Sequence, residues 1–383
     1  MYFYDITQIR KYFLISFLVT NFLNRDLSSI LLIVTLVLCL FDFKDLMDRF
    51  NKQRDLILSI LLFISTLFIT GIINHTTLDE YDNYMRILLL TPLLVISLEK
   101  KEWELILILC LCSAILHMFL YTNIINRPMS YIQSMQASFS GTASWYLTYG
   151  YMLATVIGAT LFTLVQKNKI NIFLYVPLII LALILLIFVV GGKGPLLLLI
   201  CLLVYSIKFL SKNKKILLIS IIIFFITLTI TTNNKIPERF NGLFQLSGGI
   251  INNIEDKSTR ERAVFILFGV ESILENYIYG IGPSNTEKHM HKFITENSYI
   301  SRTSDHLHND YFDIATKFGF PALVLLIFYY SRIIKYGGHF TFIFLFCLCF
   351  SQLFQSQFAH HQATTFFISL LYLSMKKITN NKP

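Results

Sequence analysis

Charged residues are scarce in this sequence. Of its 383 residues only 14% are charged, against about 25% in an ordinary soluble domain. Runs such as 56–73 and 216–230 contain no charge at all. With 55% hydrophobic residues and a mean hydropathy of +0.62, most of the chain is expected to lie in lipid. The composition argues against a water-soluble enzyme, and it excludes a disordered or collagen-like chain.

Cysteines are also few, and none lies where a disulfide framework would need it. All six fall inside apolar runs that are predicted to span the membrane. The pairs Cys110/Cys112 and Cys347/Cys349 are two residues apart, which places the two thiols on different sides of a helix. The six cysteines are therefore expected to pack as small apolar residues, and not to bind zinc.

Apolar runs long enough to cross, or nearly cross, a hydrocarbon core of about 30 Å recur about twelve times. The sequence therefore predicts an all-α polytopic membrane protein with about twelve transmembrane helices and one large outer loop. The expected parts are a transmembrane bundle of about nine spans at 1–231, the outer loop at 232–310, and about three spans with a cytoplasmic tail at 311–383. Single spans are expected at 86–98 and 311–330.

The positions of the basic residues predict the orientation. Of the 32 lysines and arginines, 19 fall in one alternating set of connecting segments. Before the outer loop, the other set contains only Arg25, Arg86, Arg127 and Lys193. By the positive-inside rule the first set is cytoplasmic, so both termini are cytoplasmic and the number of spans is even. The net charge of +9 thus indicates topology and gives no independent support for binding nucleic acid.

The outer loop contains a predicted amphipathic helix. Ser258 with Glu261 three residues later is typical of a capping box, and the helix is expected to run to about Tyr277. Arg260 and Arg262 lie in its first turn, where the unpaired N–H groups and the helix dipole favour an anion. The pair is thus a candidate anion site at the membrane surface. The alternative is headgroup contact, or pairing with Glu255, Asp256 or Glu261.

Histidines precede the next apolar run. His308, at the outer mouth of that span, is a candidate proton acceptor near neutral pH, with its tautomer fixed by Asp305, Asp310 or Asp313. An ordinary polar boundary between loop and helix is the alternative. Metal binding is a further alternative, because there are two His-x-His pairs, but no cysteine or compact carboxylate set completes a site; these pairs are His289/His291 and His306/His308.

Two more basic residues lie at outer ends of predicted spans. Lys193 is flanked by glycines and is a candidate phosphate ligand, or else a snorkelling lysine in a tight turn. Arg86, which follows an acidic stretch, has the same two interpretations. His360 and His361 add polarity at the outer start of the last span. Every candidate chemical group is therefore expected to face outward.

Three motifs resemble the O-antigen ligase and polymerase superfamily, whose multispan enzymes transfer undecaprenyl-linked glycans outside the cytoplasmic membrane. His308 and Asn309, with Gly319 further on, resemble the family's His-Asn motif at the mouth of a span. Arg262 stands at the family's spacing before a stretch similar to Asn-Pro-x-x-Gly-x-Gly, which here contains Asn276, Gly280 and Gly282, with Tyr277 in place of the proline.

The third motif is less similar. The family carries a Ser/Thr-Arg-Gly turn where this sequence has Lys193 between two glycines. Lysine keeps the positive charge but loses the two-pronged geometry of the guanidinium. Segments 82–92 and 355–367 look closer to the ligase branch than to the polymerase branch. The resemblance covers nearly the whole chain.

The resemblance implies an O-antigen ligase in lipopolysaccharide biosynthesis, located in the bacterial inner membrane with its loop and active site facing the periplasm. It would be a metal-independent, inverting glycosyltransferase without a cofactor, using an undecaprenyl-diphosphate-linked glycan as donor and lipid A-core as acceptor. His308, Arg262 and Lys193 would be catalytic. Polymerisation of undecaprenyl-linked repeats is the alternative, followed by transport of polysaccharide or lipid. Substrate binding would fall to six further residues: Arg260, Arg86, Asn309, His306, Gly280 and Gly282.

Overall fold

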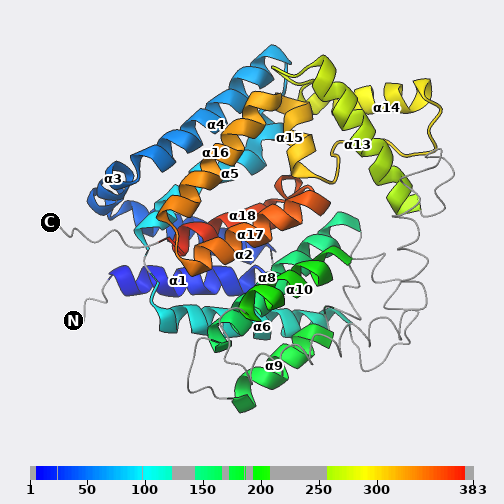
Figure 1. Ribbon diagram of the computed structural model, residues 1–383. Coiled ribbons are helices and arrows are strands. Elements are labelled where there is room, and N and C mark those ends of the chain that lie inside the picture. Colours follow the sequence, from blue (N-terminus) through cyan, green and yellow to red (C-terminus); the bar gives the residue numbers. More distant parts are fainter. Residues whose placement is uncertain are drawn as a thin grey trace.

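The computed structural model describes residues 6–23, 25–96, 98–122, 143–165, 172–184, 186, 193–207 and 257–375. These residues form helices and connecting segments, and the only β-type pairing among them is an isolated bridge between Gly337 and Met375 (Figure 1). The predicted all-α class is therefore confirmed for the described part of the chain. The predicted span at 216–230 and the start of the outer loop at 232–256 lie outside it.

The helices follow one another with short connections. The first group is α1 (Ile6–Thr20), α2 (Arg25–Leu40), α3 (Phe43–Lys52), α4 (Arg54–Ile73), α5 (Asp82–Leu89), α6 (Lys100–Thr122), α8 (Ala143–Val165), α9 (Ile172–Ile184) and α10 (Lys193–Ile207). The second group is α13 (Lys257–Glu275), α14 (Thr286–Glu296), α15 (Asp310–Phe318), α16 (Phe320–Tyr336), α17 (His339–Phe354) and α18 (His361–Leu373). Short 3-10 helices occur at η1 (Leu78–Tyr81), η2 (Thr91–Val95), η7 (Pro283–Asn285) and η8 (Gln357–Ala359).

One described helix, α4, is long and apolar enough to cross a membrane by length and composition. A second candidate is the bent pair Asp26–Leu40 and Phe43–Lys52, whose halves meet at 86°. Shorter apolar helices occupy Thr148–Leu164, Gly194–Ser206 and His339–Phe354. The number of about twelve spans therefore stays a prediction.

Helix α18 lies at the centre of the molecule, with α5, α8 and α17 packed around it (Figure 1). Every residue from Gln362 to Leu373 is buried. The Tyr372 hydroxyl donates to the Ile87 carbonyl oxygen at 2.7 Å and accepts from the Tyr329 hydroxyl at 3.1 Å. By contrast, α4 exposes large apolar side chains such as Ile72, which is 74% exposed. An exposed apolar helix face is the surface that lipid would cover.

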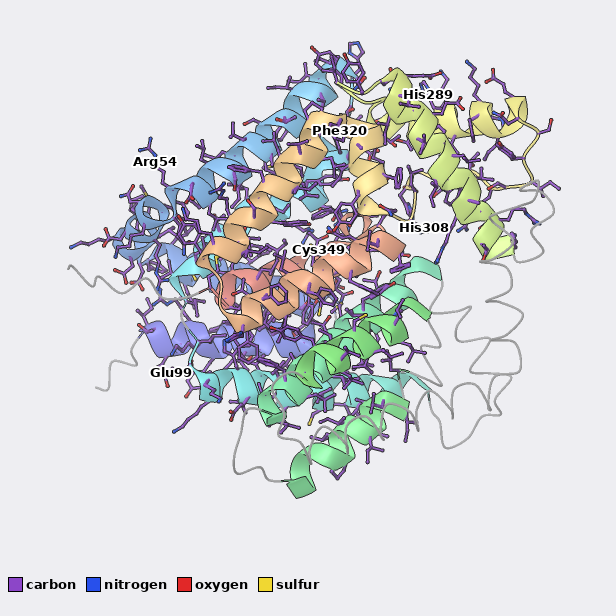
Figure 2. All side chains as sticks on the ribbon, viewed as in Figure 1. Arg54, Glu99, His289, His308, Phe320 and Cys349 are labelled. Atoms are coloured by element: carbon purple, nitrogen blue, oxygen red, sulfur yellow. The ribbon has the colours of Figure 1, made fainter. Side chains whose placement is uncertain are left out.

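The two opposite ends of the described bundle carry different kinds of charged and polar residues. At one end, salt bridges join segments far apart in sequence: Arg10 pairs with Asp42, and Lys11 pairs with Glu102 at 2.7 Å. These residues belong to, or adjoin, the segments that the charge bias assigns to the cytoplasm. Figure 2 shows Arg54 and Glu99 towards this side, with His308 and His289 on the other. Basic residues of these segments thus pair with acidic residues of neighbouring segments at this end, and His308 and His289 lie away from them.

Two predicted single spans are each broken in the structure. The stretch 86–98 contains the end of α5 followed by η2, because Pro92 has no N–H to continue the α-helix. The stretch 311–330 is divided between α15 and α16 at Gly319. The outer-loop helix also differs, since α13 begins at Lys257 and ends at Glu275, so Ser258 lies inside the first turn and is not its N-cap.

At Gly319, where α15 ends and α16 begins, the loop that follows α13 packs against the backbone. Gly319 has φ 85° and ψ 165°, a conformation that is essentially restricted to glycine. A β-carbon there would overlap the Ile278 carbonyl oxygen. The Tyr277 carbonyl oxygen accepts from the Phe320 amide at 2.7 Å, and the Ile281 amide donates to the Thr316 carbonyl oxygen at 2.9 Å. The loop after α13 is thereby fixed against the end of α15.

Gly319→Ala should destabilise the protein by about 2–5 kcal/mol, because the side chain adds backbone strain and a clash with a carbonyl that cannot move freely. The measurement is thermal unfolding of the detergent-solubilised protein. Gly338→Ala is the matched control, since Gly338 has ordinary extended backbone with φ −109°. Equal unfolding temperatures for the two variants would show that the junction tolerates a side chain.

Candidate active site

An arginine and three histidines from separate segments come together at one end of the bundle. This end lies opposite the Arg10–Asp42 and Lys11–Glu102 salt bridges. Arg262 comes from α13, His306 and His308 from the loop before α15, and His360 from the turn before α18. Figure 2 shows His308 between α13 and the ends of α15 and α17. The fold therefore assembles at one place residues that are up to about a hundred positions apart.

Arg262 is the cationic side chain of this site that could bind an anionic ligand. Within the described residues no hydrogen bond or salt bridge to its guanidinium is found, whereas its neighbours in the first turns of α13 are engaged. Arg260 Nε donates to the Ile300 carbonyl oxygen at 3.0 Å, and Glu261 Oε2 pairs with Arg302 Nε at 3.3 Å. The predicted pair of anion-binding arginines is thus divided: Arg260 holds the loop, and Arg262 acts electrostatically on His308.

Lys193 is the first residue of α10, so its backbone N–H lies at a helix N-terminus. Its side chain is outside the described part of the structure, but its neighbour Gly194 can be placed. A β-carbon on Gly194 would clash with the Tyr151 hydroxyl oxygen of α8. Arg262 also acts electrostatically on Tyr151. Tyr151 therefore links the start of α10 to the arginine of α13.

His308 has a positive φ of 54°, which residues other than glycine seldom adopt, although asparagine, aspartate and histidine do so more often than the rest. Its ring centroid lies 5.7 Å from that of Phe265 and 4.7 Å from that of His306. Burial, together with the neighbouring His306 and Arg262, lowers the pKa of His308 from 6.5 to about 3. At neutral pH its imidazole is uncharged and has a lone pair to accept a proton.

None of the three aspartates proposed to fix the His308 tautomer contacts its ring, which corrects that prediction. Asp305 Oδ1 lies 2.6 Å from Nδ1 of His306 instead. Asp313 accepts from the Leu307 amide at 3.2 Å and pairs with Lys317 at 3.1 Å. A carboxylate therefore reaches the neighbouring imidazole, and Asp313 orders the backbone that carries His308.

Asp310 organises the opposite wall of the site. Its carboxylate is fully buried and accepts from the backbone amides of Gln357 at 2.9 Å and Phe358 at 3.3 Å. Those amides belong to the turn that leads to His360. Buried amides need such partners, so Asp310 fixes the position of His360 relative to α15.

The structure gives Asn309 a local architectural role. Its Oδ1 accepts from the amides of Tyr311 at 3.0 Å and Phe312 at 3.2 Å, which makes it the N-cap of α15. Its Nδ2 donates to the Leu353 carbonyl oxygen at the end of α17. Both ends of the amide are thus used within the protein, and the residue positions His308 instead of offering free groups to a substrate.

Gly280 and Gly282 are likewise accounted for by backbone geometry. Their φ angles are 64° and 83°, and a β-carbon on Gly280 would overlap the backbone of Lys317. The Gly282 amide donates to the Lys317 carbonyl oxygen at 3.0 Å. The predicted glycine loop therefore packs against the end of α15 and is fixed there by backbone hydrogen bonds.

His360 closes the site from the α18 side. Its ring lies 6.3 Å from that of His306, and its Nε2 is 3.0 Å from Nε2 of Gln355. Burial, followed by the nearby His306 and His361, lowers the pKa of His360 to about 4. The sequence pointed to His360 only as polarity at the start of a span, whereas the structure places it within the histidine cluster.

Arg86 lies in a separate polar cluster. Its guanidinium donates to Thr365 Oγ1 at 2.9 Å and pairs with Asp82 at 3.0 Å, and His361 Nδ1 lies 3.1 Å from the same Asp82 carboxylate. A cavity of about 40 Å³ borders the cluster, with Asn21, Ser28 and Ser29 among its lining residues. The structure thus does not bring Arg86 together with Arg262 and His308.

The structure places no set of metal ligands around the two His-x-His pairs in its described residues. Among the residues whose placement is described, no group of three or more His, Cys, Asp or Glu side chains is arranged to hold a metal ion. His289 and His291 lie exposed on α14, and Figure 2 shows His289 apart from His308.

Sequence reasoning missed Tyr151, and it did not foresee the architectural roles of Asp310 and Asp313. Tyr151 is one of several tyrosines in a membrane-type run, which is too common a pattern to single it out. The aspartates had a detectable signal, because two carboxylates within the first turn of a helix that follows a histidine pair are unusual in an apolar environment.

The geometry defines a class: the described residues form an all-helical protein in which an arginine without a described partner lies beside half-buried imidazoles at one end of the bundle. Comparison with known families is consistent with this class. The model of the family described as "O-Antigen ligase" matches residues 191–327, which include Lys193, Arg262 and His308. No curated protein matches the chain.

This match of residues 191–327 supports the resemblance to the O-antigen ligase and polymerase superfamily seen in the motifs. Members are typically integral to the membrane. The matched family implies a glycosyltransferase-like enzyme that acts on polysaccharide or lipid-linked substrates and is connected with lipopolysaccharide synthesis. The family match does not distinguish ligation from polymerisation.

Proposed function

We propose that the protein is an O-antigen ligase, which transfers a glycan from undecaprenyl diphosphate to lipid A-core on the periplasmic face of the inner membrane. The observation that carries the proposal is Arg262, a guanidinium with no partner among the described residues, acting on the neutral imidazole of His308 within the matched family segment. A cation for the leaving group and a base for the acceptor are the two groups that such a transfer requires.

The diphosphate would lie at Arg262, with Lys193 and the N-terminus of α10 close by through Tyr151. Guanidinium and ammonium groups stabilise the negative charge that develops when the glycosidic C–O bond breaks and its electron pair passes to the diphosphate oxygen. The protein's own cations supply this charge in the proposed metal-independent reaction, and the proposal includes no cofactor.

His308 would contact the acceptor. The acceptor hydroxyl oxygen attacks the anomeric carbon on the face opposite the leaving diphosphate, which inverts the configuration, and its proton passes to the imidazole nitrogen of His308. The imidazole is uncharged at neutral pH because burial and nearby cations lower its pKa to about 3. Its buried, backbone-constrained position favours a fixed orientation for the attacking hydroxyl.

Location and topology are part of the same proposal. The outer loop at 232–310 would be periplasmic, between the transmembrane regions at 1–231 and 311–383, and both termini would be cytoplasmic. Support comes from the salt-bridged basic segments at one described end and the histidine site at the other. Exposed apolar side chains on α4, such as Leu58 and Ile72, suit contact with acyl chains.

The direct test is deletion in the bacterium that encodes the chain, followed by electrophoresis of its envelope glycolipids. A ligase deletion should leave lipid A-core uncapped while polymer accumulates on the undecaprenyl carrier. Core bearing a single repeat would indicate a polymerase instead. Unchanged surface glycan with intact carrier pools would overturn both activities.

Lys193→Arg should retain much of the activity, whereas Lys193→Ala should lose about 100-fold, because the charge contacts the diphosphate and not merely the helix end. The measurement is the rate of glycan transfer by purified protein in vesicles, with membrane levels of each variant matched. Equal activity of the two variants would place Lys193 among residues that only support the structure.

A further inference from the structure

The Asp305–His306 pair lies beside the proposed base but has no part in the proposed chemistry so far. Asp305 is 77% exposed, whereas the His306 side chain is only 18% exposed. Their contact, 2.6 Å between Oδ1 and Nδ1, joins the outer solution to the interior of the site. With Nδ1 donating to the carboxylate, the lone pair of His306 is on Nε2.

Nε2 of His306 is buried and has no hydrogen-bond partner in the described structure. An orphaned buried polar atom costs stability and calls for a functional explanation. The nearest ring is that of His308, with centroids 4.7 Å apart and planes at 82°, so the edge of one ring faces the other. The χ2 torsion of His308 is soft, so the orientation of its ring relative to His306 can adjust.

His308 alone is poorly suited to hold a proton. Burial, followed by the neighbouring His306, Arg262 and Arg302, lowers the pKa of His308 to about 3, and a base is most effective when its pKa lies near the working pH. A group that stabilises the imidazolium only while it forms would offset this weakness. The orphaned Nε2 belongs to the ring beside His308 and can accept such a hydrogen bond.

We propose that Asp305, His306 and His308 act as one chain, in which His306 accepts a hydrogen bond from His308 as His308 takes the acceptor proton. The proton leaves the acceptor hydroxyl for one nitrogen of His308, and the N–H on the other nitrogen donates to Nε2 of His306. The charge on the imidazolium is then stabilised through His306 by the carboxylate of Asp305. Asp305 and His306 are positioning residues, and the inference rests on the proposed glycosyl transfer.

The chain has the logic of a nucleophile–base–carboxylate triad with an imidazole inserted between base and carboxylate. Other charged groups facing it are accounted for. His360 lies 6.3 Å from His306 and is bonded to Gln355, Lys317 acts on Asp305 but pairs with Asp313, and Arg302 pairs with Glu261. No described carboxylate other than Asp305 forms a hydrogen bond with either ring of the chain.

The test uses full-length protein in vesicles and, as donor, the undecaprenyl-linked glycan that accumulates in membranes of the deletion strain. Asp305→Asn and His306→Gln should each lower kcat by roughly 10- to 100-fold with the KM for donor unchanged. Asp305→Glu should restore much of the loss. The matched control is His289→Gln, an exposed histidine of α14 outside the site, which should behave as wild type.

The pH profile separates this role from a structural one. Removing the Asp305 charge makes the His308 imidazolium a stronger acid, so the limb on which activity rises with pH should move to lower pH in Asp305→Asn while the plateau falls. A wild-type kcat in Asp305→Asn and His306→Gln would overturn the proposed hydrogen-bonded chain of Asp305, His306 and His308, but not the proposed transferase activity. A wild-type protein that transfers no glycan would overturn the proposed function and the chain with it.

Discussion

Arg262→Ala should abolish glycan transfer, lowering the rate by at least about 1000-fold, because the diphosphate leaving group would lose its main stabilising charge. The loss should appear in kcat as well as in donor binding, since charge on the leaving oxygen grows as the glycosidic bond breaks. The site supports this expectation: within the described structure Arg262 has no carboxylate to neutralise, so removing it leaves no buried partner unpaired.

Two further variants decide whether the effect is chemical. Arg262→Lys keeps the charge but loses the bidentate fork, and should show intermediate activity. Arg260→Ala removes a neighbouring guanidinium whose Nε donates to the Ile300 carbonyl oxygen, and should cost less than about 10-fold in rate. The assay is transfer to core in vesicles at matched protein amounts, with undecaprenyl diphosphate binding measured separately. Comparable losses for Arg260→Ala and Arg262→Ala would reject the special role of Arg262.

The helical class and the polarity of the ends could be predicted because they depend on local sequence properties. Long uncharged runs specify helices in lipid, and basic clusters specify the side that stays in the cytoplasm. The breaks at Pro92 and Gly319 were harder to predict. Gly319 looks like an ordinary glycine in an apolar run, and only the Ile278 carbonyl packed against it shows why the chain must break there.

The sequence predicts which residue types the candidate site contains, but it does not predict their hydrogen-bond partners. Arg262 and His308 stand in recognisable motifs, so the sequence alone predicts both as site residues. Their hydrogen-bond partners depend on how α13, α15 and the turn before α18 meet, which no local pattern encodes. Asp305 illustrates this: the sequence offers three carboxylates near His308, and the fold directs that one to His306 instead.

His308→Ala should also abolish transfer, with a loss of about 100- to 10,000-fold, because it removes the proton acceptor and the group that orients the acceptor hydroxyl. Donor binding should be kept, since Arg262 remains. Membrane levels and thermal unfolding at neutral pH should stay close to wild type, because the side chain forms no hydrogen bond with a described residue that would be left unpaired. Substantial surface glycan in this variant would reject His308 as the base.

Acid stability gives an independent readout of the same residue. The pKa of His308 is lowered from 6.5 to about 3 in the folded protein, so between these values the unfolded chain binds a proton that the native state does not. Folding stability contributed by neutral His308 is therefore complete above about pH 6.5 and decreases on acidification, at up to about 1.4 kcal/mol per pH unit. His360 contributes in the same direction, with a folded pKa of about 4. His308→Ala should flatten this dependence between pH 6.5 and 4, measured as unfolding temperature in detergent. An unchanged slope would mean that His308 is already solvated and protonates freely, and a base of that kind would not need the buried setting that the fold builds around it.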